Sequence, residues 1–251
     1  MSAPWMPRIA SEIDRRLLVN YRIDPEVAAR VVPAPFRPQL VDGHAVAGIC
    51  LIRLRSIRPA GLPAWVGIAS ENAAHRFAVE WDEPDGSIRT GVYVPRRDSS
   101  SWANVLLGGR LFPGVHHHAG FDVEETEDRL RVGFATDDRT TTVQVEVRVA
   151  GTLDSTLFES LEEASTFFEG GALGYSPARA TGRFEALELR TSAWRVEPVR
   201  VDRSHSSYFE DTAVFSPGAA ELDHALLMRR VPVAWAAAPT MRGEAAPLRR
   251  S

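Results

Sequence analysis

The sequence predicts an α+β protein dominated by one mainly antiparallel, strongly curved β-sheet or barrel with three or four short helices. Apolar and polar residues alternate along most of the chain, which is typical of half-buried strands. Helical patterns are few and short, and capping residues, proline or paired glycines bound them. No linker, internal repeat or low-complexity tract divides the chain. We therefore expect a single domain over residues 10–240 and a flexible tail over residues 241–251.

The N-terminal segment predicts two strands around a short helix. Apolar residues occupy the odd positions from Leu17 to Ile23, with polar residues between most of them. Asp24 is a good N-cap and Pro25 a good first helical residue, so a helix starts here and ends by about Val32. Residues 45–58 then predict a long strand whose apolar first half runs through the middle of a sheet.

The next segment predicts a hairpin and a second helix. Residues 75–81 and 88–94 alternate around Asp85-Gly86, a signal of a tight turn. The run from Asp98 to Ser101 consists of capping residues. It predicts a helix over residues 102–107, which the pair Gly108-Gly109 ends.

The C-terminal half contains the clearest alternation. Residues 130–134 and 143–149 predict a hairpin. Ser160 and Glu163 form a capping-box pattern that opens a helix, and the pair Gly170-Gly171 closes it. Strands are expected again from Arg183 onward, the last over residues 221–238.

Composition excludes several classes of function. The net charge of −4 argues against a nucleic-acid or anionic-membrane partner. The single cysteine, Cys50, allows no intrachain disulfide and no cysteine-rich zinc site, and its apolar surroundings predict an inert thiol. No secretory signal or membrane span is recognised, so a cytoplasmic protein is expected. Phosphate-loop, nucleophile-elbow and zinc-peptidase motifs are absent from the sequence.

The chain contains no lysine, because all 29 basic residues are arginine. A guanidinium stays protonated and cannot condense with a ketone. Catalysis through a lysine imine is therefore excluded by composition alone.

A series of short motifs resembles the YqjF-like bacterial branch of the acetoacetate-decarboxylase-like superfamily. The motifs recur there in the same order, and they are Tyr21-Arg22-Ile23-Asp24-Pro25-Glu26, Val32-Pro33, Leu40-Val41-Asp42-Gly43, Ile57-Arg58-Pro59 and Gly61-Leu62-Pro63. Looser matches follow at His75-Arg76-Phe77, Gly91-Val92-Tyr93 and His118-Ala119. The resemblance covers residues 10–122 well and the remainder only by pattern.

This resemblance implies a cone-like β-barrel with an interior pocket for a small molecule and a tendency to form homo-oligomers. It does not imply a reaction, because one fold hosts many chemistries. The namesake of the superfamily uses a lysine whose pKa a neighbouring cation depresses. That mechanism cannot operate here.

Arg22, Arg58 and Arg76 are the candidates for binding the carboxylate of a substrate. Each lies on or at the end of a predicted strand, so a barrel could direct all three into one cavity. A guanidinium can hold a carboxylate through two parallel hydrogen bonds. The alternative for each is a surface arginine or one half of a structural ion pair.

The candidates for acid–base catalysis are His118 and His75, followed by Glu71 and Tyr93. Imidazole titrates near neutral pH, burial can turn a carboxylate into a base, and a phenol can donate to an enolate. Solvated histidines and core packing of the tyrosine are the alternatives. His116 and His118 would share one face of a strand and could bind a metal, but no third ligand is specified, so no metal is predicted. Asp223 and His224 are neighbours on a strand, so they are not expected to form a dyad.

Two functions are favoured, and metal-assisted chemistry at His116 and His118 stays open as a third. The first is an enzyme that needs no cofactor and acts on a small keto acid or polyketide-like acid as a lyase, hydratase, cyclase or isomerase. It requires that Arg76, Arg58 and either His118 or His75 converge on one pocket. The alternative is a ligand-binding or sensory protein without catalysis on the same barrel.

Overall fold

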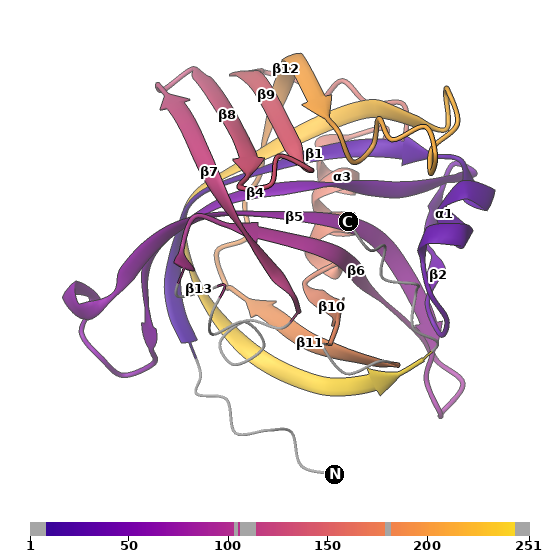
Figure 1. Cartoon of the computed structure of the whole chain (residues 1–251), viewed down its shortest axis with the longest axis horizontal. Helices are drawn as coiled ribbons and strands as arrows, with labels where there is room; N and C mark the ends of the chain where they lie inside the picture. The colour runs from indigo at the N-terminus through magenta and orange to yellow at the C-terminus, as the bar shows by residue number, and fades with distance from the viewer. Residues whose placement is uncertain (1–8, 103–104, 106–113, 179–181, 244–251) are drawn as a thin grey trace.

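The computed structural model describes residues 9–102, 105, 114–178 and 182–243 (Figure 1). Its helices are α1 (Pro25–Val31), α3 (Leu161–Gly170) and the short 3-10 helix η1 (Ala64–Val66). Its strands are β1 (Ile9–Ile23), β2 (Arg37–Pro38), β3 (Leu40–Val41), β4 (His44–Pro59), β5 (Ile68–Asp82), β6 (Ile88–Ser99), β7 (His116–Glu125), β8 (Arg129–Thr136), β9 (Thr142–Val149), β10 (Leu173–Pro177), β11 (Arg183–Arg190), β12 (Glu197–Ser206) and β13 (Ala220–Arg242). The expected dominance of strands is confirmed.

All the strands belong to one curved sheet. Its order is β11-β10-β6-β7-β8-β9-β12-β13-β1-β4-β5-β2, with β3 beside β4. The longest strands are β1, β4, β5 and β13, and we call these the long strands. β6 also pairs with β5, and β11 pairs with β13, so both ends of the remaining series of strands pair with the long strands. The pairs β10–β6 and β6–β7 are parallel and the other pairs are antiparallel. Figure 1 shows β8, β9 and β12 above β1, β4 and β5, and β10 and β11 below them, with β7 crossing in front of β4 and β5.

The long strands carry a different apolar core on each face. On β4, Ile49 and Leu51 belong to a core that extends toward β8 and β9. The alternating residues Cys50 and Ile52 belong to a second core, which α3 covers with Phe168. Side chains of successive residues point to opposite faces of a strand. The first core fills the β7–β9 branch, and the second lies on the face that β10, β11 and α3 cover.

The two predicted helix caps are confirmed. The carboxylate of Asp24 accepts hydrogen bonds from the backbone nitrogens of Glu26 and Val27. The hydroxyl of Ser160 accepts from the nitrogen of Glu163 at 3.1 Å, and the carboxylate of Glu163 accepts from the nitrogen of Glu159. These contacts satisfy backbone donors that the first helical turn leaves free. The helix expected over residues 102–107 and the glycine pair after it lie mostly outside the described residues.

Several strands extend beyond their expected ends. β5 begins at Ile68 instead of residue 75, and β6 continues to Ser99 instead of stopping at residue 94. β13 continues to Arg242, where it pairs with Arg183 of β11, so part of the expected tail is strand. Cross-strand hydrogen bonds to a neighbour favour extended backbone even where the local sequence carries capping residues or proline. Among the described helices, none is long and apolar enough to cross a membrane.

Candidate functional site

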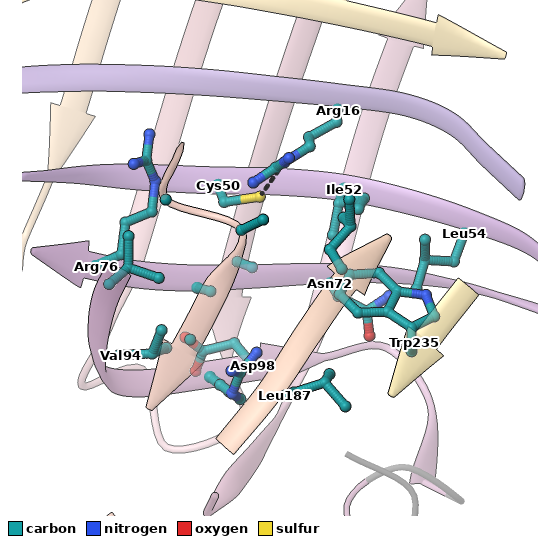
Figure 2. A pocket seen from close by; sticks show the side chains of 18 of the residues that line it. Arg16, Cys50, Ile52, Leu54, Asn72, Arg76, Val94, Asp98, Leu187 and Trp235 are labelled. Atoms are coloured by element: carbon teal, nitrogen blue, oxygen red, sulfur yellow. Dashed lines mark hydrogen bonds between the residues drawn. The ribbon is translucent and has the colours of Figure 1, made fainter. Parts of the chain in front are cut away.

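A cavity of about 110 Å³ lies on the face of β1, β4 and β5 that carries Cys50 and Ile52, and residues of β10, β11 and β13 also line it. Its walls are largely apolar, and they include Ile52, Leu54, Val94, Leu187 and Trp235 (Figure 2). Six polar or charged side chains other than the cysteine also line it, namely Arg16, Asn72, Arg76, Arg97, Asp98 and His116. A concave apolar space with a few convergent polar groups is typical of a small-molecule site.

Three arginines line this cavity, and none of them forms an ion pair with a carboxylate in the described part of the chain. Arg76 is only 5% exposed, donates from Nη2 to Asn20 Oδ1 at 2.6 Å, and has a buried Nε without a partner. Arg97 donates from Nε to the hydroxyl of Ser176 at 3.1 Å. Arg16 donates from Nε to the sulfur of Cys50 at 3.2 Å. Arg76 is buried, and Arg16 and Arg97 are half-buried. Charges withdrawn from water are normally paired, so these cations have unused capacity for an anion.

Burial lowers the pKa of both Arg76 and Arg97 to about 10. The charge of Arg16 acts in the same direction on Arg76. Both guanidinium groups nevertheless remain protonated at neutral pH. The cavity therefore presents concentrated positive charge, in which a bound carboxylate would be strongly favoured.

Asp98 is the carboxyl group of this cavity. Its side chain is fully buried, and burial raises its pKa to about 6. Arg96 opposes that rise, because its Nε donates to both carboxylate oxygens at 3.1 and 3.2 Å. A carboxyl group that titrates near neutral pH can both take up and release a proton.

His116 is the second titratable group with a proton-accepting atom. Burial, together with the charge of Arg97, lowers its pKa to about 4. Its buried Nδ1 has no hydrogen-bond partner among the described residues. At neutral pH the imidazole is therefore uncharged and can accept a hydrogen bond from a ligand.

A buried chain of polar groups lies behind Arg76. Asn20, which accepts from Arg76, also contacts His224 Nε2 through its Nδ2 at 3.0 Å. His224 Nδ1 lies 2.6 Å from Asp223 Oδ2. Burial would raise the pKa of Asp223, but hydrogen bonds from His224, Ser155 and Thr156 hold it well below its usual range. The chain holds the Asn20 amide, and through it Arg76, in one orientation.

The pairing of Asp223 with His224 corrects the expectation that these two strand neighbours do not form a dyad. The strands β1 and β13 change register between Asn20 and Tyr21, where Asn20 pairs with His224 but Tyr21 pairs with Leu222. Asp223 is therefore the extra residue of a β-bulge. Bulging breaks the alternation of side chains, so the carboxylate can reach the adjacent imidazole.

Of the three arginines expected to bind substrate, only Arg76 lines the cavity. Arg22 is on the surface, where it pairs with Glu221 and contacts Thr156. Arg58 donates to the backbone oxygens of Leu62 and Ser56, each at 2.8 Å, outside the cavity. Both arginines therefore hold surface segments of this fold together and do not face the cavity.

The expected catalytic residues Glu71 and His75 lie on the opposite face of β5 from Arg76. Glu71 accepts from Arg15 and from Arg53, each at 2.6 Å. His75 is fully buried against Tyr208, with ring centroids 4.5 Å apart, and neither ring nitrogen has a partner in the described part of the chain. Burial and the charge of Arg96 lower the pKa of His75 to about 3.

Tyr93 and His118 also lie away from the cavity lining. Tyr93 packs in an aromatic cluster with Phe36 and Phe184, and burial raises its pKa to about 12. His118 stacks on Trp102 with centroids 4.1 Å apart, and its Nδ1 lies 2.9 Å from Asp137. No group of three or more possible metal ligands occurs among the described residues. Arg76 was expected to converge with Arg58 and with His118 or His75 on one pocket. The fold does not bring these residues together, because only Arg76 among them lines the cavity.

Sequence reasoning missed Arg16, Arg97, Asp98 and His116 as members of one site. Alternation along β5 already separates Arg76 from Glu71 and His75, and that signal was available. The run from Asp98 to Ser101 resembles a helix cap, so the sequence did not predict that Asp98 lies on a strand. The register of β6 against β7, which pairs Arg97 with His116, is a tertiary property.

Residues 11–232 match the DUF2071 family, whose members are described as an uncharacterized conserved protein. The match spans most of the described strands. Among curated proteins, none matches the chain significantly.

Solved structures with the same fold are acetoacetate-decarboxylase-like enzymes. One is an acetoacetate decarboxylase-like enzyme from Sphingomonas wittichii RW1, with a TM-score of 0.59, 13% identity, and coverage of 97% of this chain and 95% of that chain. Another is the enduracididine biosynthesis enzyme MppR complexed with the condensation product of pyruvate and imidazole 4-carboxaldehyde, with a TM-score of 0.58, 14% identity, and coverage of 96% and 90%. A third is acetoacetate decarboxylase from Legionella pneumophila, with a TM-score of 0.54, 11% identity, and coverage of 98% and 92%. At these identities the likeness shows the fold.

Proposed function

This chain belongs to the DUF2071 family, and we propose that it is an enzyme that binds a small keto acid in the arginine-lined cavity. The observation that carries the proposal is the set of three cations, Arg16, Arg76 and Arg97, that line one cavity without a carboxylate partner in the described chain. A carboxylate ligand would supply the missing counter-charge. The structural neighbours support a keto acid, since one is complexed with pyruvate and others are named for acetoacetate.

The size of the cavity limits the ligand. A volume of about 110 Å³ lies well below the several hundred cubic ångströms of pockets that enclose drug-sized ligands. Of the two ligand classes expected from the sequence, a keto acid of a few carbons therefore fits better than a polyketide-like acid. The apolar walls would surround its short carbon chain.

The proposed chemistry is proton transfer at the carbon next to the ketone, as in a lyase, hydratase, cyclase or isomerase. Arginine fixes the carboxylate and stabilises negative charge that develops on the carbonyl oxygen. Asp98 titrates near neutral pH and takes or returns the proton, and the uncharged His116 accepts a hydrogen bond from the substrate. No step passes through a lysine imine, because the chain has no lysine.

The binding step is tested by thermal unfolding with pyruvate and with its uncharged methyl ester. Pyruvate should stabilise the wild type, by about 2.7 kcal/mol at one hundred times its Kd, and the ester should not. Arg76→Gln should weaken pyruvate binding more than tenfold, because a hydrogen bond to a charged group contributes about 1.5–3 kcal/mol. Arg58→Gln is the matched control, since Arg58 lies outside the cavity, and it should bind like the wild type. Equal stabilisation by acid and ester would contradict the proposal.

A binding protein without catalysis is the second candidate. The contact of Arg96 with both oxygens of the Asp98 carboxylate favours this second candidate, because a carboxylate that is already hydrogen-bonded is less free to take a proton from a substrate. The two functions differ in proton exchange. An enzyme should exchange the methyl protons of pyruvate for deuterium in heavy water faster than the Asp98→Asn variant does, as measured by mass spectrometry. Stabilisation by pyruvate without any such exchange would identify the binding protein.

A further inference from the structure

The wall of the cavity includes the thiol of Cys50, which the sequence had predicted to be inert. Cys50 follows Ile49 on β4 and faces the cavity side of the sheet. The residues next to Cys50 in the sequence are apolar, and an apolar environment predicts an inert thiol. The residues that approach it across the strands are not apolar.

One arginine, on β1, contacts this sulfur, and arginines on β5 and β6 line the same cavity. Arg16 Nε donates to Cys50 Sγ at 3.2 Å, as Figure 2 shows, and the same guanidinium contacts the sulfur of Met228. Cys50 and the two other cavity arginines, Arg76 and Arg97, are close enough to interact electrostatically. Reactive cysteines are found in electropositive surroundings of this kind.

A second observation points independently to a ligand beside this sulfur. Arg76 is 5% exposed, lines the same cavity, and keeps its Nε buried without a partner in the described chain. A ligand whose carboxylate met this guanidinium would lie within the cavity whose wall includes Cys50. In a space of about 110 Å³, the other end of a keto acid cannot be far from the sulfur.

We propose that Cys50 is a covalent nucleophile that adds reversibly to the ketone of the bound acid. The inference rests on the proposed function, because the arginines must first bind the carboxylate. The sulfur forms a bond to the carbonyl carbon, the π-electron pair of the carbonyl moves to its oxygen, and the thiol proton ends on that oxygen. The product is a hemithioketal, and its formation needs no oxidant, reductant or other reactant. Cys50 thereby takes a covalent role in a cavity that contains no amine side chain.

Alkylation tests whether the sulfur and the arginines form one site. Cys50 is the single cysteine, so any thiol adduct of the folded chain is seen directly in its intact mass. Iodoacetate carries a carboxylate, and iodoacetamide is its uncharged analogue. In an apolar pocket the charged reagent should be slower, because its carboxylate loses hydration. We expect the reverse here, at least a tenfold preference for iodoacetate. Arg76→Gln should remove the preference, Arg58→Gln should retain it, and pyruvate should protect the thiol.

Carbon-13 NMR with pyruvate labelled at the ketone tests the covalent bond itself. Addition of the sulfur converts the labelled carbon from a carbonyl to a saturated centre. The wild type should show this new resonance in addition to the hydrate of free pyruvate, and Cys50→Ala and Cys50→Ser should not. A spectrum of the wild type identical to that of Cys50→Ala would overturn the covalent proposal.

The outcomes separate this inference from the function on which it rests. If pyruvate stabilises the wild type but not Arg76→Gln, and Cys50 is inert to both reagents in the folded protein, the nucleophile is refuted and the anion site stands. If Cys50 reacts faster with iodoacetamide and pyruvate gives no protection, both proposals fail. The circular dichroism spectrum and the Tm of each variant, measured without ligand, establish that the compared proteins are folded.

Discussion

Arg15 and Arg16 are neighbours on β1, yet their surroundings differ completely. The side chain of Arg15 is 1% exposed and contacts Glu71 at 2.6 Å, in a network that also includes Arg53 and Glu125. Arg16 points to the other face, where its polar contacts are the sulfurs of Cys50 and Met228. One face of the sheet thus neutralises its buried arginines, and the other leaves them without a carboxylate among the described residues.

This difference distinguishes structural charge from functional charge. A paired buried ion contributes to stability only through its partner, and its removal leaves an uncompensated charge. Cations that converge on a cavity without carboxylate partners gain no ion pair for the fold and are held in place by the structure around them. The contrast predicts that substitutions on the paired face change stability and that substitutions on the cavity face change ligand binding.

Removing the central carboxylate of the paired face should have the largest effect. Glu71→Gln leaves Arg15 buried beside a neutral amide, and we expect a loss of about 3 kcal/mol in the free energy of unfolding. Urea denaturation measures it. Glu221→Gln is the control, because Glu221 pairs with Arg22 at the surface and should cost less than about 1 kcal/mol. Equal losses in the two variants would remove the distinction between the paired network and ordinary surface ion pairs.

The buried imidazole on the same face should make stability depend on pH. Burial and the charge of Arg96 lower the pKa of His75 from 6.5 to about 3, so the unfolded chain binds the proton more tightly than the folded one. Its contribution to stability is therefore complete above the unfolded pKa and is lost progressively as the pH falls from the unfolded pKa to the folded pKa. Between pH 6.5 and 5 the wild type should lose about 1.5 kcal/mol more than His75→Phe does.

Urea titrations at each pH measure this difference. His205→Gln, which replaces a partly exposed histidine paired with Glu210, controls for the loss of an imidazole. Parallel pH curves for the wild type and His75→Phe would show that His75 is not held neutral by burial.

On the cavity face, Arg16→Met should change the free energy of unfolding by less than about 1 kcal/mol, because no ion pair is lost. The same substitution should reduce the stabilisation by pyruvate by about 1 kcal/mol, since one of the surrounding charges is removed. Thermal unfolding with and without pyruvate measures both quantities. Marked destabilisation without ligand, together with unchanged pyruvate binding, would reverse the assignment of the two faces.

The smallest expected effect is the pH dependence of ligand binding. The pKa of Asp98 is raised to about 6, so this group gains a negative charge in the cavity as the pH rises through that value. Pyruvate, which stays ionised, should therefore bind a few-fold more weakly at pH 7.5 than at pH 5, a difference below about 1 kcal/mol. Asp98→Asn should bind with little dependence on pH. Calorimetric titration at the two pH values tests this, and an identical slope in both proteins would contradict it.

The elements of the fold could be predicted well from local patterns, and the candidate site only in part. Alternation located β1, β8 and β9, an apolar run located β4, and capping residues located α1 and α3. Of the predicted site residues, Arg76 lines the cavity, but Glu71 and His75 were grouped with it although they alternate onto the other face of β5. Period-two alternation states which residues share a face, but not which face encloses a cavity.

The sequence by itself determined the predominance of strands, the helix caps and the exclusion of a lysine imine, because each depends on residue identity or short-range spacing. Only the tertiary structure decided which charges meet. The register of β6 against β7 pairs Arg97 with His116, and a bulge in β13 places Asp223 beside His224. Strands distant in the chain brought Arg16, Arg76 and Arg97 to one cavity. Register and bulges arise from the packing of whole strands, and no local pattern encodes them.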